Sequence, residues 1–305
     1  MDILIGADPE FFLKDKETGK FVSAYGMIEG TKKNPLKVDG GAVQVDGMAL
    51  EFNIDPARSR KEFSGNITKV LAQLRAMIPD KYEFVFTPVA HFGEEYIQSQ
   101  PPEAKVLGCD PDFNAYRDGA PNPTPDGSLG FRTASGHIHI GWTNDVSITD
   151  PEHLDACHML IKQLETVLGT SSLAWDDDTT RRELYGKAGS YRPKPYGVEY
   201  RTLSNAWLRS PNLIDYVYNT AYWAVSELLE GRQHYVSYYA GGVENTINTN
   251  KVSRAYEIVN RLGLYDENVF TLFSMRIRQA NILAGGDTYM AATTGTNTFM
   301  DFGNA

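Results

Sequence analysis

The most constraining feature of the chain is a seven-residue stretch, Ser135-Gly136-His137-Ile138-His139-Ile140-Gly141, in which polar and apolar side chains alternate. Successive side chains of an extended strand point to opposite faces, so His137 and His139 share one face and the two isoleucines share the other. The pattern predicts a half-buried strand. One of its faces belongs to a hydrophobic core, and the other presents two imidazoles to a candidate site.

Three other stretches show the same alternation with carboxylates. Each places an acid and a second polar residue on one face: Asp8 with Glu10, Glu51 with Asn53, and Glu199 with Arg201. We expect these strands and the histidine strand to lie in one sheet, with their polar faces converging on a single site.

Strand patterns dominate up to residue 90, and helical patterns dominate later. Strand-like alternation fills residues 3–25, 43–54 and 82–90, and a short turn at 17–20 predicts an antiparallel hairpin. Apolar residues recur every three or four positions in five predicted helices, which run from Ser59 to Pro79, from Asp150 to Gly169, from Ser210 to Gly231, and over about 251–261 and 267–283. The pattern predicts an α+β fold with a mostly antiparallel sheet and helices on one face.

Two segments carry no periodic pattern. Residues 91–130 contain six prolines and five glycines, and a loop of that length is uncommon inside a domain unless it is functional. We expect it to border the site, because Arg132 and the histidine strand follow directly. Residues 1–284 are expected to form a single domain, and residues 285–305, rich in Gly, Thr and Asn, a flexible C-terminal tail.

Charge and composition exclude several classes of protein. The net charge of −10 argues against a chain that coats nucleic acid or anionic membrane, since phosphate attraction needs a basic surface. No run reaches the roughly 18 apolar residues of a membrane helix. The first residues lack the features of a signal peptide. The chain has two cysteines, which are too few to form a disulfide framework. We therefore expect a cytoplasmic protein with neither nucleic acid nor membrane as a partner.

The acids on these strands indicate a metal site. Glu10, Glu51 and Glu199 each adjoin an aromatic residue, and a carboxylate is rarely buried unless it is paired or coordinated. A solvent-facing strand explains one such acid, but three of them together with a His-x-His pair favour convergence. Oxygen ligands with one imidazole suit Mg²⁺ or Mn²⁺, whereas zinc more often recruits several histidines or thiolates. His137 and His139 leave a zinc site open.

A basic segment follows these acids in the chain. Residues 181–194 contain five cations with glycines among them. Guanidinium groups bind phosphate oxygens in pairs, although a solvated basic loop is the alternative. Arg201 shares a strand face with Glu199, so a phosphate-binding cation and a metal ligand would lie together. Enzymes that transfer phosphoryl groups typically use a metal ion together with arginines. The sequence contains neither a dinucleotide-binding glycine motif nor a P-loop.

These motifs carry a resemblance to a known family. In order along the chain, Gly-x-Asp-Pro-Glu, Leu-Glu-Phe-Asn, Ser-Gly-His-Ile-His-Ile-Gly and Glu-Tyr-Arg resemble the carboxylate–amine ligases of the glutamine synthetase and glutamate-cysteine ligase superfamily. The most similar group is the phage-type amidoligases called COOH-NH2 ligase type 2. The resemblance spans roughly residues 1–230 and implies a catalytic domain like that of glutamine synthetase over residues 1–284. Its curved antiparallel sheet would hold ATP with Mg²⁺ or Mn²⁺ on the concave face.

The resemblance also implies residue roles. The metal ligands would be Glu10, Glu51, Glu199 and one histidine, for which we favour His139, while His137 would lie nearer the nucleotide phosphates. Arg192 and Arg201 would hold the transferring phosphoryl group, and Lys187 and Arg132 would join the nucleotide-binding set. Asp8 stands where the superfamily often carries the first glutamate of Glu-x-Glu. We expect Asp8 to orient or deprotonate the amine, with a strand-capping role as the alternative.

The implied reaction is ATP-dependent formation of an amide bond through an acyl phosphate, from small-molecule or peptide carboxylate and amine substrates. For a phage-encoded chain it would take place in the host cytoplasm. A zinc hydrolase that uses the His-x-His strand is a second hypothesis, and a non-catalytic phage structural or binding module that keeps the fold is a third. The sequence identifies neither substrate and leaves the oligomeric state open.

Overall fold

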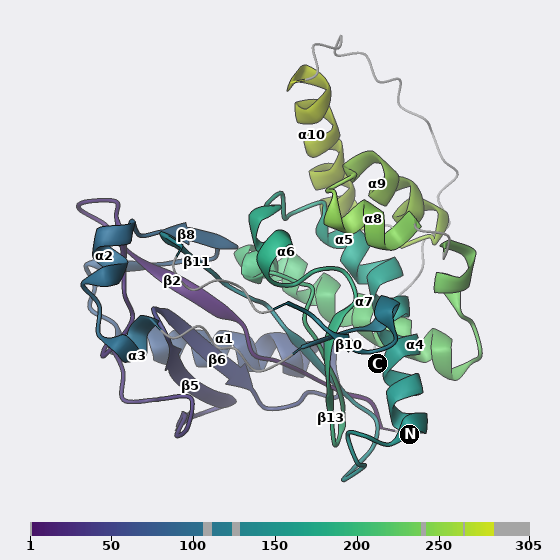
Figure 1. Ribbon diagram of the computed structural model, residues 1–305, viewed down its shortest axis with the longest axis horizontal. Coiled ribbons are helices and arrows are strands. Elements are labelled where there is room, and N and C mark those ends of the chain that lie inside the picture. The colour runs from purple at the N-terminus through teal and green to yellow at the C-terminus, as the bar shows by residue number, and fades with distance from the viewer. Residues whose placement is uncertain (1, 106–111, 124–128, 239–241, 265, 284–305) are drawn as a thin grey trace.

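Two antiparallel sheets meet near the N-terminus of the chain, and helices cover their outer sides (Figure 1). The computed structural model describes residues 2–105, 112–123, 129–238, 242–264 and 266–283. The first sheet has the order β3-β2-β6-β5-β4, with β7 paired to β2: β2 (Glu10–Asp15), β3 (Phe21–Val22), β4 (Leu36–Val38), β5 (Gly41–Asp46), β6 (Ala49–Ile54) and β7 (Tyr82–Val85).

The second sheet draws most of its strands from the middle of the chain. Its order is β1-β12-β14-β13-β9-β10: β1 (Leu4–Ala7), β9 (Phe113–Asn114), β10 (Ala120–Pro121), β12 (Ile138–Gly141), β13 (Ser190–Lys194) and β14 (Gly197–Tyr200). A separate two-stranded sheet pairs β8 (Val89–His91) with β11 (Phe131–Thr133). The strand predicted over 82–90 is therefore divided between β7 and β8.

The expectation that all four polar strands lie in one sheet is wrong, because the chain changes sheets at Pro9. Before this residue, β1 pairs with β12; after it, β2 pairs with β6, and Glu10 lies opposite Glu51. Proline has no N–H to donate and a fixed φ, so it interrupts a strand ladder. The Phe52 N–H donates to the Pro9 carbonyl at 3.2 Å, which joins the two sheets at this point.

The helices predicted from periodicity and caps are confirmed. They are α1 (Arg60–Met77), α4 (Pro151–Leu164), α7 (Pro211–Leu229), α9 (Val252–Arg261) and α10 (Glu267–Leu283). Ser59 caps α1 by accepting a hydrogen bond from the Glu62 N–H at 3.3 Å, and Ser210 caps α7 in the same way. Helix α1 lies against β5 and β6 (Figure 1).

The helix predicted to end at Gly169 continues beyond it. After α4, five residues wind as a wider π-helical turn, η2 (Glu165–Gly169), and α5 (Thr170–Ser172) completes the element. A Cβ at Gly169 would lie 2.3 Å from Glu165 Oε2. The glycine is therefore required by a close approach inside the helix and is not a terminator.

Shorter elements fill the remaining connections. They are α2 (Glu94–Gln98), α3 (Pro102–Lys105), η1 (Ala115–Arg117), α6 (Thr180–Leu184), η3 (Asn205–Arg209), η4 (His234–Tyr238) and α8 (Gly242–Asn248). The segment 91–130, predicted to be a loop, thus contains short helices and strands in its described parts. Cys109 and the predicted tail at 285–305 lie outside the described residues.

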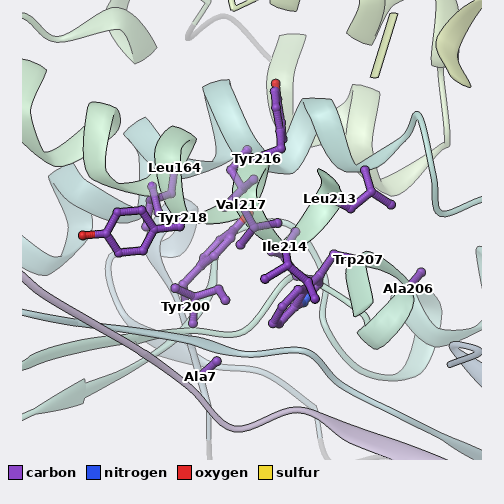
Figure 2. Close-up of a cluster of buried hydrophobic side chains, with 14 of the residues drawn as sticks. Ala7, Leu164, Tyr200, Ala206, Trp207, Leu213, Ile214, Tyr216, Val217 and Tyr218 are labelled. Atoms are coloured by element: carbon purple, nitrogen blue, oxygen red, sulfur yellow. The ribbon is translucent and has the colours of Figure 1, made fainter. Parts of the chain in front are cut away.

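One hydrophobic core joins both sheets to the helices. Ile5, Ile138, Ile140 and Val198 are completely buried on the faces opposite the histidines and Glu199. Figure 2 shows Tyr200 and Trp207 gathered with residues of α7 in this core. The α+β class with mostly antiparallel strands and helices on the outer side is confirmed. Among the described residues, no helix is both long and apolar enough to cross a membrane.

Candidate active site

A first group of potential ligands, the histidine group, consists of Asp8, His139 and Glu199. His139 pairs with Glu199 across β12 and β14, and Asp8 follows directly after β1. Asp8 Oδ1 lies 3.0 Å from His139 Nε2. One side-chain atom from each of the three residues lies within 4.8 Å of the other two, which is the spacing that a single cation requires.

A second group, the acid group, consists of Glu10, Asp46 and Glu51. Glu10 pairs with Glu51 across β2 and β6, and Asp46 ends the neighbouring β5. Their ligand atoms also lie within 4.8 Å of one another. The Ser135 N–H donates to Glu10 Oε2 at 2.9 Å, and Lys32 Nζ lies 3.1 Å from Asp46 Oδ2. One lysine thus faces three carboxylates.

The acid group is electrostatically costly without a further cation. Burial, together with the charge of Asp46, raises the pKa of Glu10 to about 7. Burial and the charges of Asp8 and Glu10 raise the pKa of Glu51 well above its ordinary value. Burial alone would raise the pKa of Asp8, but His139 and His137 outweigh it and hold that pKa well below the usual range. A divalent ion would relieve the repulsion among these carboxylates.

Three cations converge on Glu199. Lys194 Nζ lies 2.8 Å and Arg192 Nη1 3.3 Å from Glu199 Oε2, and Arg201 Nη1 donates to Glu199 Oε1. Glu199 and Arg201 are both almost completely buried. The Arg201 guanidinium also faces the Tyr185 ring, whose centroid is 5.1 Å away. Positive charge is therefore concentrated next to the histidine group.

Both histidines of the pair lie at this site. His137 Nδ1 is 3.4 Å from carboxylate oxygens of Asp8 and Glu199, while its Nε2 is buried and has no hydrogen-bond partner among the residues that the structure describes. His139 Nδ1 lies 2.5 Å from the Tyr196 hydroxyl. Which of these two groups donates depends on the ring nitrogen that carries the proton. Burial alone would lower the pKa of the His139 ring, but Asp8 beside Nε2 outweighs it and raises that pKa. Of the two imidazoles, only that of His139 belongs to a ligand group found among the described residues.

A pocket of about 590 Å³ opens beside His139. The residues that line it include Gly6, Gly141, Trp142, Tyr196, Asn53, Ile54, Pro56 and Arg58. Aromatic faces, amides and one guanidinium therefore surround a space that adjoins the histidine group. Its size suits a small organic ligand.

The basic segment 181–194 divides between the site and the core. Only Arg192 and Lys194 of its five cations contact Glu199 among the described residues. Arg182 pairs with Asp176 at 3.1 Å, and Arg181 is buried and donates to backbone carbonyls and Ser135 Oγ. Arg181 therefore supports the backbone around the histidine strand.

Two residues of the predicted nucleotide set lie apart from the ligand groups. Arg132 is almost completely buried, and its Nη1 donates to the carbonyls of Leu129 at 2.9 Å and Phe131 at 2.8 Å. No hydrogen bond or ion pair with a described residue joins it to either group. Lys187 lines a small cavity beside Asp112.

Two functional candidates were missing from the sequence prediction, Asp46 and Lys32, which belong to the acid group and its surroundings. Lys194, which contacts Glu199, was predicted only as one of the five cations of the basic segment. Asp46 resembles a hairpin-turn residue because Gly47 follows it. The signal that identifies it is its alternation with Val45 in a strand that pairs with the strand of Glu51.

The side chains fit a divalent metal of the oxygen-loving kind. The two groups contribute five carboxylates and one imidazole. Such a donor set suits Mg²⁺ or Mn²⁺, whereas a zinc site is richer in histidine or thiolate. The raised pKa values of Glu10 and Glu51 follow from the same crowding of acids.

One family of known proteins is similar to part of the chain. Residues 128–268, just under half of the chain, match the family model described as phage phiEco32-like COOH·NH2 ligase, type 2. The predicted resemblance to this family is confirmed. The match contains His137, His139, Glu199 and Arg201, whereas Glu10 and Glu51 precede it. A carboxylate–amine ligase is the function that the family match supports.

Two of the solved structures that match this chain have low sequence identity to it. A structure described as "Apo GmaS without ligand" is 10% identical, covers 96% of this chain and 71% of its own, and has a TM-score of 0.47. A bifunctional glutathione synthetase from Pasteurella multocida is 11% identical with a TM-score of 0.40. It aligns with 94% of this chain, which spans about half the length of the synthetase. No curated protein matches the sequence.

Proposed function

We propose that the protein is an ATP-dependent carboxylate–amine ligase that forms an amide through an acyl phosphate. The observation that supports this most directly is the pair of ligand groups on either side of Pro9, with Arg192 of β13 and Arg201, which directly follows β14, next to one of them. Two cation sites beside a cluster of positive side chains are suited to a triphosphate.

The two groups have distinct roles in this proposal. Glu10, Asp46 and Glu51 would hold one Mg²⁺ or Mn²⁺, and Asp8, His139 and Glu199 would hold a second. Bound ions would neutralise phosphate oxygens and make the γ-phosphorus more electrophilic. We assign Asp8 to the second ion rather than to the amine, because its oxygen lies 3.0 Å from the ring of His139 and close to Glu199.

Arg192, Arg201 and His137 would contact the transferring phosphoryl group. The two guanidiniums lie on neighbouring segments and approach the same carboxylate, so a phosphoryl group entering beside Glu199 meets both. The His137 ring lies beside the same carboxylate, with its Nδ1 3.4 Å from Glu199 Oε1. Lys187 and Arg132 stay in the proposed nucleotide-binding set on the family resemblance alone.

The pocket beside His139 would receive the base of ATP. Trp142 and Tyr196 offer aromatic surface, and the amides of Asn53 and Asn144 offer donors and acceptors. The pocket adjoins the histidine group and its cations, so a nucleoside bound there can direct its phosphates toward Arg192. Its volume of about 590 Å³ is sufficient for a nucleoside.

The proposed chemistry has two steps. A substrate carboxylate oxygen attacks the γ-phosphorus, the bond to the β-phosphate oxygen breaks, and ADP leaves with that electron pair. The amine nitrogen then attacks the acyl carbon, inorganic phosphate leaves, and the nitrogen gives up a proton to form the amide. The guanidiniums of Arg192 and Arg201 offset the charge on the phosphoryl oxygens in both steps.

The other hypotheses have less support. A zinc hydrolase would place both histidines in one ligand set, but the group found among the described residues contains His139 with two carboxylates. A non-catalytic module has no need for buried acids, which are costly to retain without a ligand.

The test uses two substitutions that keep side-chain size. Glu51→Gln and Glu199→Gln each remove one proposed ligand, and Glu83→Gln, an exposed acid on β7, is the matched control. We expect calorimetry to show Mg²⁺-dependent ATP binding in the natural protein and the control and its loss in both variants, each of which should still unfold cooperatively on heating. A screen of amino acids and polyamines for ADP release would identify the substrates.

Three outcomes contradict the proposal. ATP turnover retained in both variants would exclude this metal site. Stoichiometric zinc without ATP binding would favour the hydrolase. The absence of any heat with ATP and Mg²⁺ in the natural protein would favour the non-catalytic module.

A further inference from the structure

Glu165 is a completely buried carboxylate behind the candidate site. It opens the π-helical turn η2, and among the described residues no lysine, arginine or histidine nitrogen lies within 4.0 Å of it. A buried acid without an ion pair is costly. A core position that served packing alone would be filled at lower cost by an apolar side chain.

Three donors satisfy this carboxylate, and all of them come from the segments that carry the site. The Gly189 N–H donates to Oε1 at 2.5 Å, and the Thr202 hydroxyl donates to the same oxygen. The Tyr200 hydroxyl donates to Oε2 at 3.1 Å. Gly189 directly precedes β13, which carries Arg192, while Tyr200 and Thr202 flank Arg201 on either side.

The two segments are also joined to each other at this point. The Arg201 N–H donates to the Ser190 carbonyl at 3.0 Å, and the Thr202 hydroxyl also contacts the Lys187 carbonyl at 3.2 Å. Side chains alternate along a strand, so Tyr200 points back to Glu165 while Glu199 and Arg201 point into the site. Glu165 therefore holds these segments from the side opposite the ligand groups.

The local backbone is adapted to this carboxylate. A Cβ at Gly169 would lie 2.3 Å from Glu165 Oε2 and 2.9 Å from the Tyr200 hydroxyl. Gly189 has a φ of +86°, in the left-handed region that favours glycine. Wider helical turns of this kind occur frequently at functional sites. Gly169 thus makes room for the acid inside the π-helical turn, and Gly189 takes a backbone conformation in which its N–H reaches the carboxylate.

We propose that Glu165 is a positioning residue that fixes the Arg192 and Arg201 guanidiniums relative to Glu199. It acts through the Gly189 N–H and the hydroxyls of Tyr200 and Thr202, and it does not contact the substrates. A glutamine has one acceptor oxygen and a donor amide in its place, so it keeps the shape but cannot accept all three hydrogen bonds. The inference rests on the proposed ligase function for its kinetic readout.

The test is Glu165→Gln, compared with a matched variant of the same helix. Gln163 is also completely buried, accepts from the His234 N–H at 2.9 Å, and donates to the Arg232 carbonyl at 3.2 Å, away from the ligand groups. Gln163→Met removes those bonds. We expect Glu165→Gln to lower kcat about tenfold to a hundredfold and to change the KM for ATP less than about threefold, since the base pocket is untouched. Gln163→Met should lower the melting temperature and leave kcat unchanged.

Hydrogen exchange gives a readout that does not depend on the reaction. In the protein without substrates, Glu165→Gln should accelerate exchange over 187–192 and 199–203, and Gln163→Met should not. The proposal is overturned if a folded Glu165→Gln variant keeps both kcat and local exchange rates, or if it loses activity only in proportion to its unfolded fraction. If the natural protein releases no ADP with any substrate pair, the proposed function fails, and the exchange data alone decide the role of Glu165.

Discussion

The buried carboxylate of Glu165 makes the stability of the protein depend on pH. Burial raises its pKa from the ordinary 4.5 to about 7, although hydrogen bonds from Thr202, Gly189 and Tyr200 oppose the change. Between these two values the folded protein keeps a proton that the unfolded chain has lost. The free energy of unfolding therefore falls as the pH rises through this range.

The magnitude follows from the two pKa values. The gap between 4.5 and about 7 corresponds to roughly 3 kcal/mol. This contribution to stability is fully present below about pH 4.5 and is lost by the time the pH has passed about 7. Other buried acids titrate as well, so the contribution of Glu165 must be isolated by difference.

Urea unfolding provides that difference. The free energy of unfolding is measured for the natural protein and for Glu165→Gln at several pH values between about pH 5 and pH 8. Glutamine does not titrate, and every other acid is common to both proteins. We expect the natural protein to lose roughly 2 to 3 kcal/mol relative to the variant over this range. A stability difference that is the same at both ends of the range would refute the reasoning, because it would mean that Glu165 is ionised throughout.

Three further substitutions test the site and the core. Tyr196→Phe removes the hydroxyl that lies 2.5 Å from His139 Nδ1 and would accept the ring N–H when Nε2 binds the ion, so we expect Mn²⁺ to bind about tenfold more weakly in calorimetry; equal affinity would contradict this role. Gly136→Ala would place a Cβ 2.4 Å from the Ser204 carbonyl oxygen, and a loss of roughly 1–3 kcal/mol in urea unfolding is expected. Phe63→Ala empties a completely buried position and should cost about 3–5 kcal/mol in the same assay; a loss under about 1 kcal/mol would show that the core collapses around the cavity.

Local sequence signals predicted the helices well because their ends are set by nearby residues. Ser59 and Ser210 cap the helices that follow them, and the apolar stripes between caps and breakers face the core. Alternation likewise predicted that Glu10, Glu51, His139 and the acid of β14 share polar faces, because the period of a strand needs no knowledge of its neighbours.

Other features depend on contacts between distant parts of the chain. The exchange of partners at Pro9 is decided by which strands pack beside it, and the proline alone shows only that a ladder is interrupted. Asp46 carries the local signature of a turn, and its place beside Glu51 follows from strand pairing. The carboxylate of Glu165, which opens the π-helical turn, is held by three donors that lie far along the chain.

Pro9 has a further consequence for the geometry of the two ligand groups. Asp8 belongs to one group and Glu10 to the other, and a single ring with a restricted φ separates them. If the two sheets tilt against each other, the distance between His139 and Glu51 changes. The backbone spacing between Asp8 and Glu10 changes less, because only Pro9 separates them. The separation between the two proposed cation sites would thus be limited by one tripeptide, residues 8–10.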